Sequence, residues 1–351
     1  MSIFHKLSVK EVQKETENSV SIVFNIPPEN QEKFQFIPGQ YINIKKELDG
    51  VEVRRAYSIC SSVNSNEIRI GVKAVEKGLF SVYATTHLRV NDVLEVSAPE
   101  GRFNLNLNTE HQKTYLAFVA GSGVTPVLSM VKSVLETEPN SKFVLVYGNK
   151  SANETMFKNE IDSLQANYPN KLTVQYVFSQ YQEEGTLFGR IDISVLNYIL
   201  NNRFKELSFD DFFLCGPETM INTIQANLLE KGVSKENIHF ELFSVKEEEE
   251  VGNATSLEGE ATVTVILDDE EETFVMNKEN TILEIALKKG IDAPYSCQGG
   301  ICSTCLAKVK EGHAVMSKNS ILSDDEIKDG LILTCQAHPT TDKIIIDFDD
   351  V

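Results

Sequence analysis

The sequence predicts a multidomain protein: an antiparallel β-barrel, then an α/β domain with a parallel sheet, then a small α+β domain. Three observations support this fold class. Short strand-like runs separated by Gly and Pro fill the first part, strands alternate with helices in the second, and a third part follows an acidic stretch. At roughly 100–200 residues per domain, 351 residues agree with two or three domains.

The first part, residues 1–108, reads as a barrel. Apolar or alternating runs occur at 20–26, 40–44, 56–60 and 67–75, and Gly or Pro lies between them. Several evenly spaced short strands are typical of a small antiparallel barrel.

The second part, residues 109–245, alternates between two periodicities. Strands are expected at 115–119, 142–147, 172–178 and 212–214, and helices at 127–135, at 155–167 and before Gly232. This alternation predicts a parallel sheet flanked by helices.

Residues 246–258 are expected to be an acidic linker, because four successive glutamates are followed by Gly, Asn and Ser. The third part, residues 259–351, then shows strands at 261–267, 272–277, 306–310 and 343–348 and a helix at 281–289. The acidic run 268–272 is expected at the turn between its first two strands.

Charge and hydropathy exclude some classes of protein. The net charge of -19 argues against a nucleic-acid partner, whose phosphates this surface would repel. No run of about 18 apolar residues predicts a membrane span. The N-terminal segment carries charges where a signal peptide needs an apolar core, so a cytoplasmic location is expected.

The strongest motif is a cysteine loop. Cys297, Cys302 and Cys305 have the spacing C-x4-C-x2-C, and Cys335 follows later. This is the plant-type spacing for a [2Fe–2S] cluster, whose irons take soft thiolate ligands. Structural zinc is the alternative, but zinc sites usually pair two CxxC motifs, and only one is present.

Two glycine motifs indicate a dinucleotide site. Gly121-Ser122-Gly123-Val124-Thr125-Pro126 follows an apolar strand and opens a helix, as a dinucleotide-binding loop does. Cys215-Gly216-Pro217 repeats the order of strand, turn and helix. Cys215 as a small buried residue at a strand end is the alternative interpretation.

Two motifs in the first part suit a flavin that splits the electron pair of a hydride. In Arg55-Ala56-Tyr57-Ser58, an arginine can hold phosphate, a tyrosine can stack on the flavin ring, and a serine can hydrogen-bond to it. Gly78-Leu79-Phe80-Ser81 opens a helix whose N–H groups suit a pyrophosphate. Taken singly, such an arginine is usually solvated and such a tyrosine is usually core.

With the segment 36–41, these motifs resemble the ferredoxin–NADP reductase superfamily, and 294–305 with 333–336 resembles a plant-type ferredoxin, which implies a β-grasp fold. The resemblance implies FAD, NADP(H) and a [2Fe–2S] cluster as cofactors, with NAD(H) possible. It also implies Ser58, Cys215 and Glu241 as catalytic residues, with Phe243 beside the flavin and Thr125 touching both rings. The implied binding residues are Arg55, Ala56, Tyr57, Ser58, Gly78, Leu79, Phe80, Ser81, Gly121, Ser122, Gly123, Thr125, Pro126, Cys215, Gly216, Pro217 and Phe243.

Discrimination between NADPH and NADH falls on residues after two further strands. Asn149, Lys150, Ser179 and Gln180 occupy these strand ends, and Arg190 follows. Many NADP-specific relatives have arginine where this chain has Gln180, so Lys150 and Arg190 are the basic candidates. The nearest resemblance favours NADPH.

Across almost its whole length the chain resembles the family of reductase subunits of phenylacetyl-CoA epoxidase, through 54–60, 147–150 and 189–192. That resemblance implies electron delivery to a partner oxygenase. Other hydroxylases, desaturases, a hybrid-cluster protein, or a redox sensor without turnover are the alternatives. The chain itself is not expected to be a diiron oxygenase, because only one Glu-x-x-His match occurs, at Glu236 and His239.

Overall fold

The computed structural model describes residues 4–243 and 257–351, which form two compact units. One unit spans Phe4–Phe243 and contains two sheets, and the other contains the described residues from 257 onward. The acidic linker expected at 246–258 lies almost entirely outside the described residues. The expected fold class is confirmed, because the three larger sheets have the three predicted architectures.

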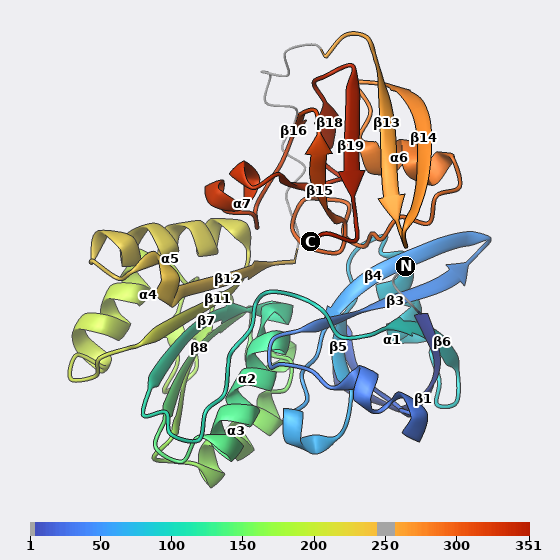
Figure 1. The fold of residues 1–351 in the computed structure, drawn as a ribbon. Helices are drawn as coiled ribbons and strands as arrows, with labels where there is room; N and C mark the ends of the chain where they lie inside the picture. The colour runs from blue at the N-terminus through green and yellow to red at the C-terminus, as the bar shows by residue number, and fades with distance from the viewer. Residues whose placement is uncertain (1–3, 244–256) are drawn as a thin grey trace. The chain divides into compact units, whose positions relative to one another are not determined.

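The first sheet is the predicted antiparallel barrel (Figure 1). Its strands are β1 (Phe4–Thr16), β2 (Ser19–Phe24), β3 (Tyr41–Leu48), β4 (Val51–Ser58), β5 (Arg69–Lys73) and β6 (Val93–Ser97), in the order β4-β3-β6-β1-β2-β5. A bridge between Ile59 and Ile70 joins the two end strands, so the sheet closes on an apolar interior. Helix α1 (Leu79–Thr86) follows β5.

Strand β1 was not among the predicted strands. Lysine and glutamate occupy much of its outward face, so its sequence lacks a clear alternation of apolar and polar residues. Its long pairings with β2 and β6 hold it in the barrel.

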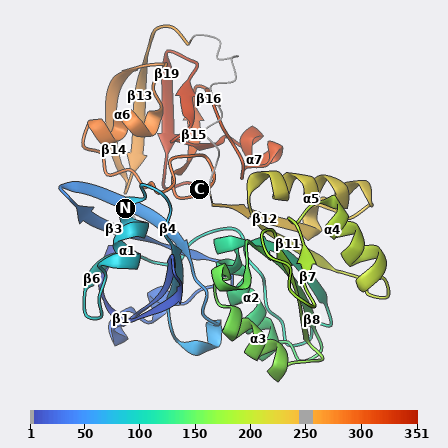
Figure 2. The same cartoon turned by 180° about the vertical axis from the view of Figure 1, so that it is seen from behind.

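The second sheet is parallel and has helices on both faces (Figures 1 and 2). Its strands are β7 (Thr114–Ala120), β8 (Lys142–Asn149), β9 (Leu172–Phe178), β10 (Leu187–Phe188), β11 (Asp211–Gly216) and β12 (Ile238–Leu242), in the order β10-β9-β8-β7-β11-β12. The helices are α2 (Val124–Thr137), α3 (Lys158–Asn167), α4 (Ile193–Tyr198) and α5 (Glu218–Glu230). The strand order reverses between β7 and β11, and ligands bind at such a switch point in open α/β sheets.

Two helices of this sheet begin away from the expected residues. Helix α2 begins at Val124 rather than 127, because Pro126 fits within a first turn whose N–H groups need no helical partner. Helix α3 begins at Lys158 rather than 155, because Phe157 has a left-handed φ of 58° that a helix cannot include.

The second unit is a mixed sheet with helix α6 (Ile282–Lys288) packed into its core. Its main strands are β13 (Glu260–Leu267), β14 (Glu270–Asn277), β15 (Leu306–Glu311), β17 (Leu331–Leu333) and β19 (Lys343–Asp347), in the order β14-β13-β19-β15-β17. A smaller pair joins β16 (Ala314–Met316) to β18 (Ala337–Pro339), and α7 (Asp324–Lys328) precedes β17. The acidic run is only partly in the turn: Asp268 and Asp269 form it, whereas the next three residues belong to β14.

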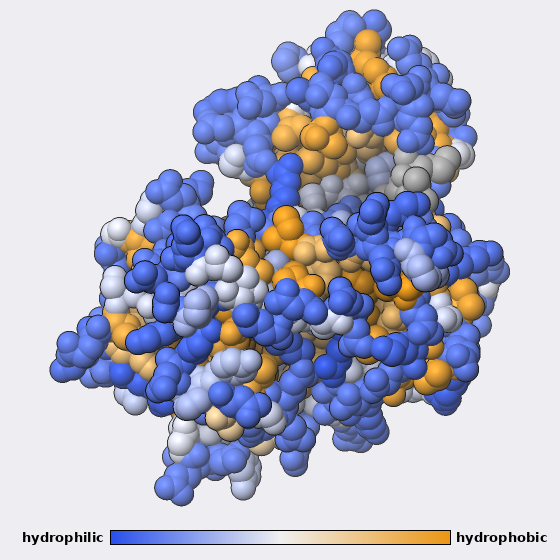
Figure 3. All heavy atoms as spheres, turned by 60° about the horizontal axis from the view of Figure 1, so that its bottom comes forward, coloured by the Kyte–Doolittle hydropathy of each residue, from blue (hydrophilic) through white to orange (hydrophobic). Residues whose placement is uncertain are grey.

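Figure 3 shows the hydropathy of one face of the molecule. Hydrophilic side chains cover most of this face, and apolar side chains gather in several patches between them. Among the described residues, none of the helices has the length and apolar character that crossing a bilayer would require.

Candidate functional site

The two glycine motifs of the parallel sheet meet at the switch point. Strands β7 and β11 are parallel neighbours, so the loop after Ala120 and the turn after Cys215 leave the sheet side by side. A side-chain carbon at Gly123 would lie 2.3 Å from the carbonyl oxygen of Cys215, closer than any real contact. Gly123 is therefore required for the close packing of these two segments.

Tyr147 was not predicted to belong to this site. Its hydroxyl donates a hydrogen bond to the carbonyl oxygen of Gly121 at 3.0 Å, and its ring is fully buried. The tyrosine thus supports the glycine loop from the end of β8. Sequence reasoning noticed the segment 147–150, but no motif connects a tyrosine there with a carbonyl 26 residues earlier.

The three residues predicted to be catalytic come together although they belong to distant parts of the chain. Ser58, at the end of β4 in the barrel, donates a long hydrogen bond of 3.4 Å to a carboxyl oxygen of Glu241 on β12. Glu241 is directly opposite Cys215 in the pairing of β11 with β12. The contact joins the barrel to the parallel sheet at the carboxyl end of β11.

Burial controls the ionisation of this group. It raises the pKa of Glu241 to about 8, while the Ser58 hydroxyl acts in the opposite direction. It also raises the pKa of Cys215 far above that of a free thiol, and the nearby Glu241 adds to the shift. A neutral carboxyl group can donate a hydrogen bond, whereas a carboxylate can only accept one.

The predicted flavin residues divide into exposed and buried groups. The side chain of Arg55 is exposed, Tyr57 is half-buried, and Ser58 and Ser81 are buried. No side chain among the described residues caps α1, which begins after Gly78, so its first N–H groups suit a phosphate. These features fit FAD.

Leu79 and Phe80, which are also in the predicted flavin set, differ in how exposed their side chains are. The Phe80 ring is buried in the barrel core, 5.5 Å from the Tyr57 ring, so only its backbone can face a ligand. Leu79 is 47% exposed. Ala56 is half-buried on β4.

The residues predicted to distinguish NADPH from NADH also lie together. The N–H groups of Ser179 and Gln180 donate to the carbonyls of Asn149 and Lys150 at 3.0 and 2.9 Å, which joins the ends of β8 and β9. Gln180 and Lys150 are exposed, as is Arg190 beyond β10. Two exposed basic side chains can therefore approach a phosphate at this edge of the sheet.

Strand pairing brings the remote fourth cysteine to the cysteine loop of the second unit. Cys305 immediately precedes β15, Cys335 lies two residues after β17, and Leu306 pairs with Leu333 across these strands. Both the amide and the hydroxyl of Thr334 donate to the Cys305 carbonyl, at 3.0 and 2.9 Å. The fold thus assembles the four predicted ligands at one place.

The donor set fits a [2Fe–2S] cluster. All four thiols are free of disulfides. Hydrogen bonds from the Cys302 and Cys335 thiols lower the pKa of Cys297, and the same hydrogen bonds raise the pKa of these two donors, so the four sulfurs interact as one group. The buried hydroxyl of Ser296 has no hydrogen-bond partner among the described residues, and a cluster sulfur would accept its hydrogen.

Structural zinc would take the same four thiolates around one ion, whereas a [2Fe–2S] cluster shares them between two irons, two to each.

The backbone of the cysteine loop enters the left-handed region at two residues. The left-handed residues are Gln298, with a φ of 51°, and Gly300, with a φ of 70°. Gly299 instead donates its N–H to the Cys297 sulfur at 3.4 Å, as it would to a ligated thiolate.

Family models cover most of the chain. Residues 6–105 match the oxidoreductase FAD-binding domain, 118–226 the oxidoreductase NAD-binding domain, and 265–340 the 2Fe-2S iron-sulfur cluster binding domain. The order agrees with the three sheets and with the motifs on them.

Two curated relatives match over nearly their whole length. The chain is 38% identical to a subunit of 1,2-phenylacetyl-CoA epoxidase of Escherichia coli (strain K12), over 99% of both chains. It is 33% identical to the ferredoxin reductase component of 3-ketosteroid-9-alpha-monooxygenase of Rhodococcus rhodochrous, over 97% of this chain and 96% of the relative.

A solved structure shares the fold over the full length. Phthalate dioxygenase reductase, described as a modular structure for electron transfer from pyridine nucleotides to [2Fe-2S], aligns with a TM-score of 0.61 and 21% identity. The alignment covers 98% of each chain. At this identity the likeness shows the shared architecture.

Proposed function

Because this chain belongs to the family of reductases with FAD-binding, NAD-binding and 2Fe-2S domains that includes the 1,2-phenylacetyl-CoA epoxidase relative, we propose that it moves electrons from NAD(P)H to a partner oxygenase. The observation that carries the proposal is the contact of Ser58 with Glu241, 3.4 Å apart. Through it, a flavin-motif residue of the barrel meets the carboxyl end of the nicotinamide sheet.

The residues of the first unit bind FAD and the nicotinamide nucleotide and orient their rings. Arg55 and the start of α1 would hold the phosphate groups of FAD, and Tyr57 would stack on its ring. The glycine loop at Gly121–Gly123 and the turn after Cys215 would hold the nicotinamide nucleotide. Proximity and alignment of the two rings provide most of the rate enhancement expected for such a site.

Ser58 and Glu241 provide hydrogen-bonding groups where the flavin and nicotinamide rings would meet. Near pH 7 the half-buried Glu241 carboxyl group is largely protonated, because desolvation raises its pKa to about 8. It can therefore donate a hydrogen to a ring acceptor without adding a negative charge beside it. When bound, the flavin accepts a hydride and releases electrons singly, and the cluster accepts them singly.

The second unit delivers the electrons, and its acceptor is proposed from the relatives. Relatives at 38% and 33% identity are named as components of an epoxidase and of a monooxygenase. We propose a partner oxygenase of the phenylacetyl-CoA epoxidase type, in the cytoplasm. A reductase for another hydroxylase or desaturase is the second candidate, favoured by the likeness to the ketosteroid monooxygenase component.

An anaerobic visible spectrum tests the proposal. The purified chain should show flavin and iron–sulfur absorbance, and stepwise NADPH or NADH should bleach both. The nucleotide that bleaches faster identifies the preferred donor. A chain that binds flavin and iron but is not bleached by either nucleotide would contradict the proposed function.

A further inference from the structure

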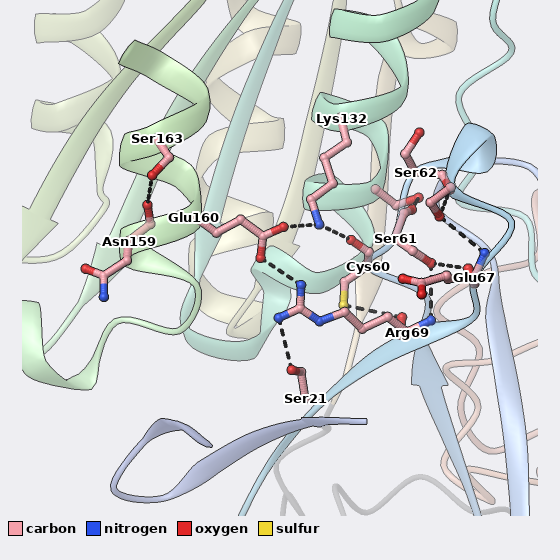
Figure 4. Close-up of polar contacts among 12 residues, drawn as sticks. Ser21, Cys60, Ser61, Ser62, Glu67, Arg69, Lys132, Asn159, Glu160 and Ser163 are labelled. Carbon is pink, nitrogen blue, oxygen red and sulfur yellow. Dashed lines mark hydrogen bonds and ion pairs between the residues drawn. The ribbon is translucent and has the colours of Figure 1, made fainter. Parts of the chain in front are cut away.

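A row of polar contacts joins residues 60–66, which follow the flavin-motif strand β4, to helix α2, which begins after the glycine loop (Figure 4). We call this row of contacts the seam, and β4 the flavin strand. The segment 60–66 directly continues β4, and it lies along one face of α2. Ser129 donates to the carbonyl of Ser61 at 2.7 Å, and Lys132 donates to the carbonyl of Cys60 at 3.0 Å. One turn after Ser129, the hydroxyl of Ser133 accepts a hydrogen bond from the amide of Val63 at 3.2 Å.

The seam continues to the end of the helix. Glu136 accepts hydrogen bonds from the hydroxyl of Ser62 and from the side chain of Asn64. The contacting positions on α2 recur every three to four residues, which places them on a single helix face. The segment after β4 is therefore held along about two turns of α2.

The charged centre of the seam is Glu160 on α3. Its carboxylate lies between two cations, Lys132 on α2 and Arg69 on β5 of the barrel, the latter at 2.9 Å. Arg69 also pairs with Glu15 of β1 at 2.8 Å. The side chains of Lys132 and Arg69 are only 11% and 16% exposed, so water screens these charges poorly.

The barrel also approaches the start of α2 closely. A side-chain carbon at Gly71 of β5 would lie 2.6 Å from a methyl carbon of Thr125, which follows the glycine loop. Arg69 is the first residue of the same strand, two residues before Gly71. The same strand thus touches the nicotinamide-loop helix near its beginning and, through Glu160, along its length.

We propose that Glu160 is a positioning residue for hydride transfer, and this inference depends on the proposed function. It bridges Arg69 of the barrel and Lys132 of the nicotinamide helix, and so holds the flavin strand and the glycine loop in one fixed arrangement. Glu160 belongs to none of the cofactor-binding motifs. It acts through the seam, whose two ends are the flavin strand and the glycine loop.

The physical argument is one of alignment. Ser58 lies two residues before the seam, and Gly123 immediately precedes α2. A shift of α2 against the segment 60–66 would therefore move the two ring-binding segments relative to each other. A misplacement of about 1 Å costs on the order of 100-fold in rate. Without the Glu160 charge, Arg69 and Lys132 would repel each other across the seam.

The test is Glu160→Gln in the full-length, cofactor-loaded protein. Anaerobic stopped-flow mixing with saturating NADPH or NADH measures the limiting rate of flavin reduction and the nucleotide Kd separately. We expect the limiting rate to fall about 10- to 100-fold with little change in Kd. Hydrogen exchange should increase at residues 60–66, a readout that does not depend on turnover.

Asp162→Asn is the matched control. Asp162 lies on the same helix, but its partners Lys158 and Tyr176 belong to the same sheet domain. The substitution removes one negative charge from α3 without touching the barrel. It should leave flavin reduction and exchange at 60–66 as in the unaltered chain.

Lys132→Met is a second variant in case Glu160→Gln does not fold. It leaves Glu160 paired with Arg69 and keeps a side chain of similar length, and we expect a smaller fall in the limiting rate. A normal rate in either folded variant would overturn the inference. No flavin reduction in the unaltered chain would instead overturn the proposed function, and the inference with it.

Discussion

The cysteine site of the second unit and the nicotinamide site of the first are assembled at different ranges along the chain. Three of the four cysteines lie within nine residues, and one strand pair brings in the fourth. The nicotinamide site instead combines the ends of β7 and β11 with Glu241 of β12 and Ser58 of the barrel. Substituting a ligand should therefore have the largest effect on the cysteine site, whereas a change in packing should have the largest effect on the nicotinamide site.

The largest effect is expected at the ligands. Cys302→Ser keeps the shape of the side chain but replaces a soft thiolate with a hydroxyl that binds iron poorly. Iron content and the iron–sulfur absorbance should be lost, and reduction of cytochrome c should fall to background. Flavin bleaching by the nucleotide should persist, because the first unit is unchanged.

The control for this variant is Cys60→Ser. Cys60 is buried in the first unit, and burial raises the pKa of its thiol to about 12, so it is an unreactive core residue. Its substitution should leave the iron content intact. A Cys302→Ser protein that retained its full iron content would contradict the ligand assignment.

A smaller effect is expected at Gly123, where close packing of two segments shapes the nicotinamide site. Gly123→Ala would place a carbon 2.3 Å from the Cys215 carbonyl oxygen and force the two glycine segments apart. Flavin reduction should slow about 100-fold. Overpacking should also lower the free energy of unfolding by about 1–3 kcal/mol. Stopped-flow kinetics and denaturant unfolding measure the two effects.

Gly121→Ala provides the comparison within the same loop. Gly121 has a φ of 56°, but no atom lies within 4 Å of a side-chain carbon placed there. This variant should lose about 1–2 kcal/mol from backbone strain, with a smaller loss of rate. Equal rates in the two variants would show that close packing at Gly123 does not govern the site.

The last effect concerns pH, and it builds up over several pH units. Glu241 has a folded-state pKa of about 8, above its usual 4.5, so between these values the folded chain holds a proton that the unfolded chain has released. The unfolding free energy should therefore decrease as pH rises through this range, by up to about 1.4 kcal/mol per unit from this group. Flavin reduction should show the same transition near pH 8.

Glu241→Gln tests this pH dependence, because glutamine is neutral at every pH. Both the stability contribution and the kinetic transition should be absent in this variant. Glu230→Gln, an exposed position at the end of α5, should retain both. A transition near pH 8 that survived in Glu241→Gln would have to belong to another group.

Local patterns predicted the fold well where burial repeats along one segment. The apolar run 115–119 and the strand 172–178 follow from composition alone, and the latter matches β9 residue for residue. Strand β1 was not predicted, because its outward face is charged. It can be recognised only from its pairing with β2 and β6 in the folded chain. Phe80 belongs to a predicted cofactor motif and its ring lies in the core, because a motif does not show where each side chain points.

The sequence by itself determined the order of the three domains, the cysteine spacing and the two glycine motifs. These features are legible because each depends on residues close together in the chain. Only the tertiary structure decided that Ser58 meets Glu241, that Tyr147 supports Gly121, and that Glu160 lies between two cations. Such contacts join residues far apart in sequence, and their energy comes from burial and charge pairing, which exist only after the chain has folded.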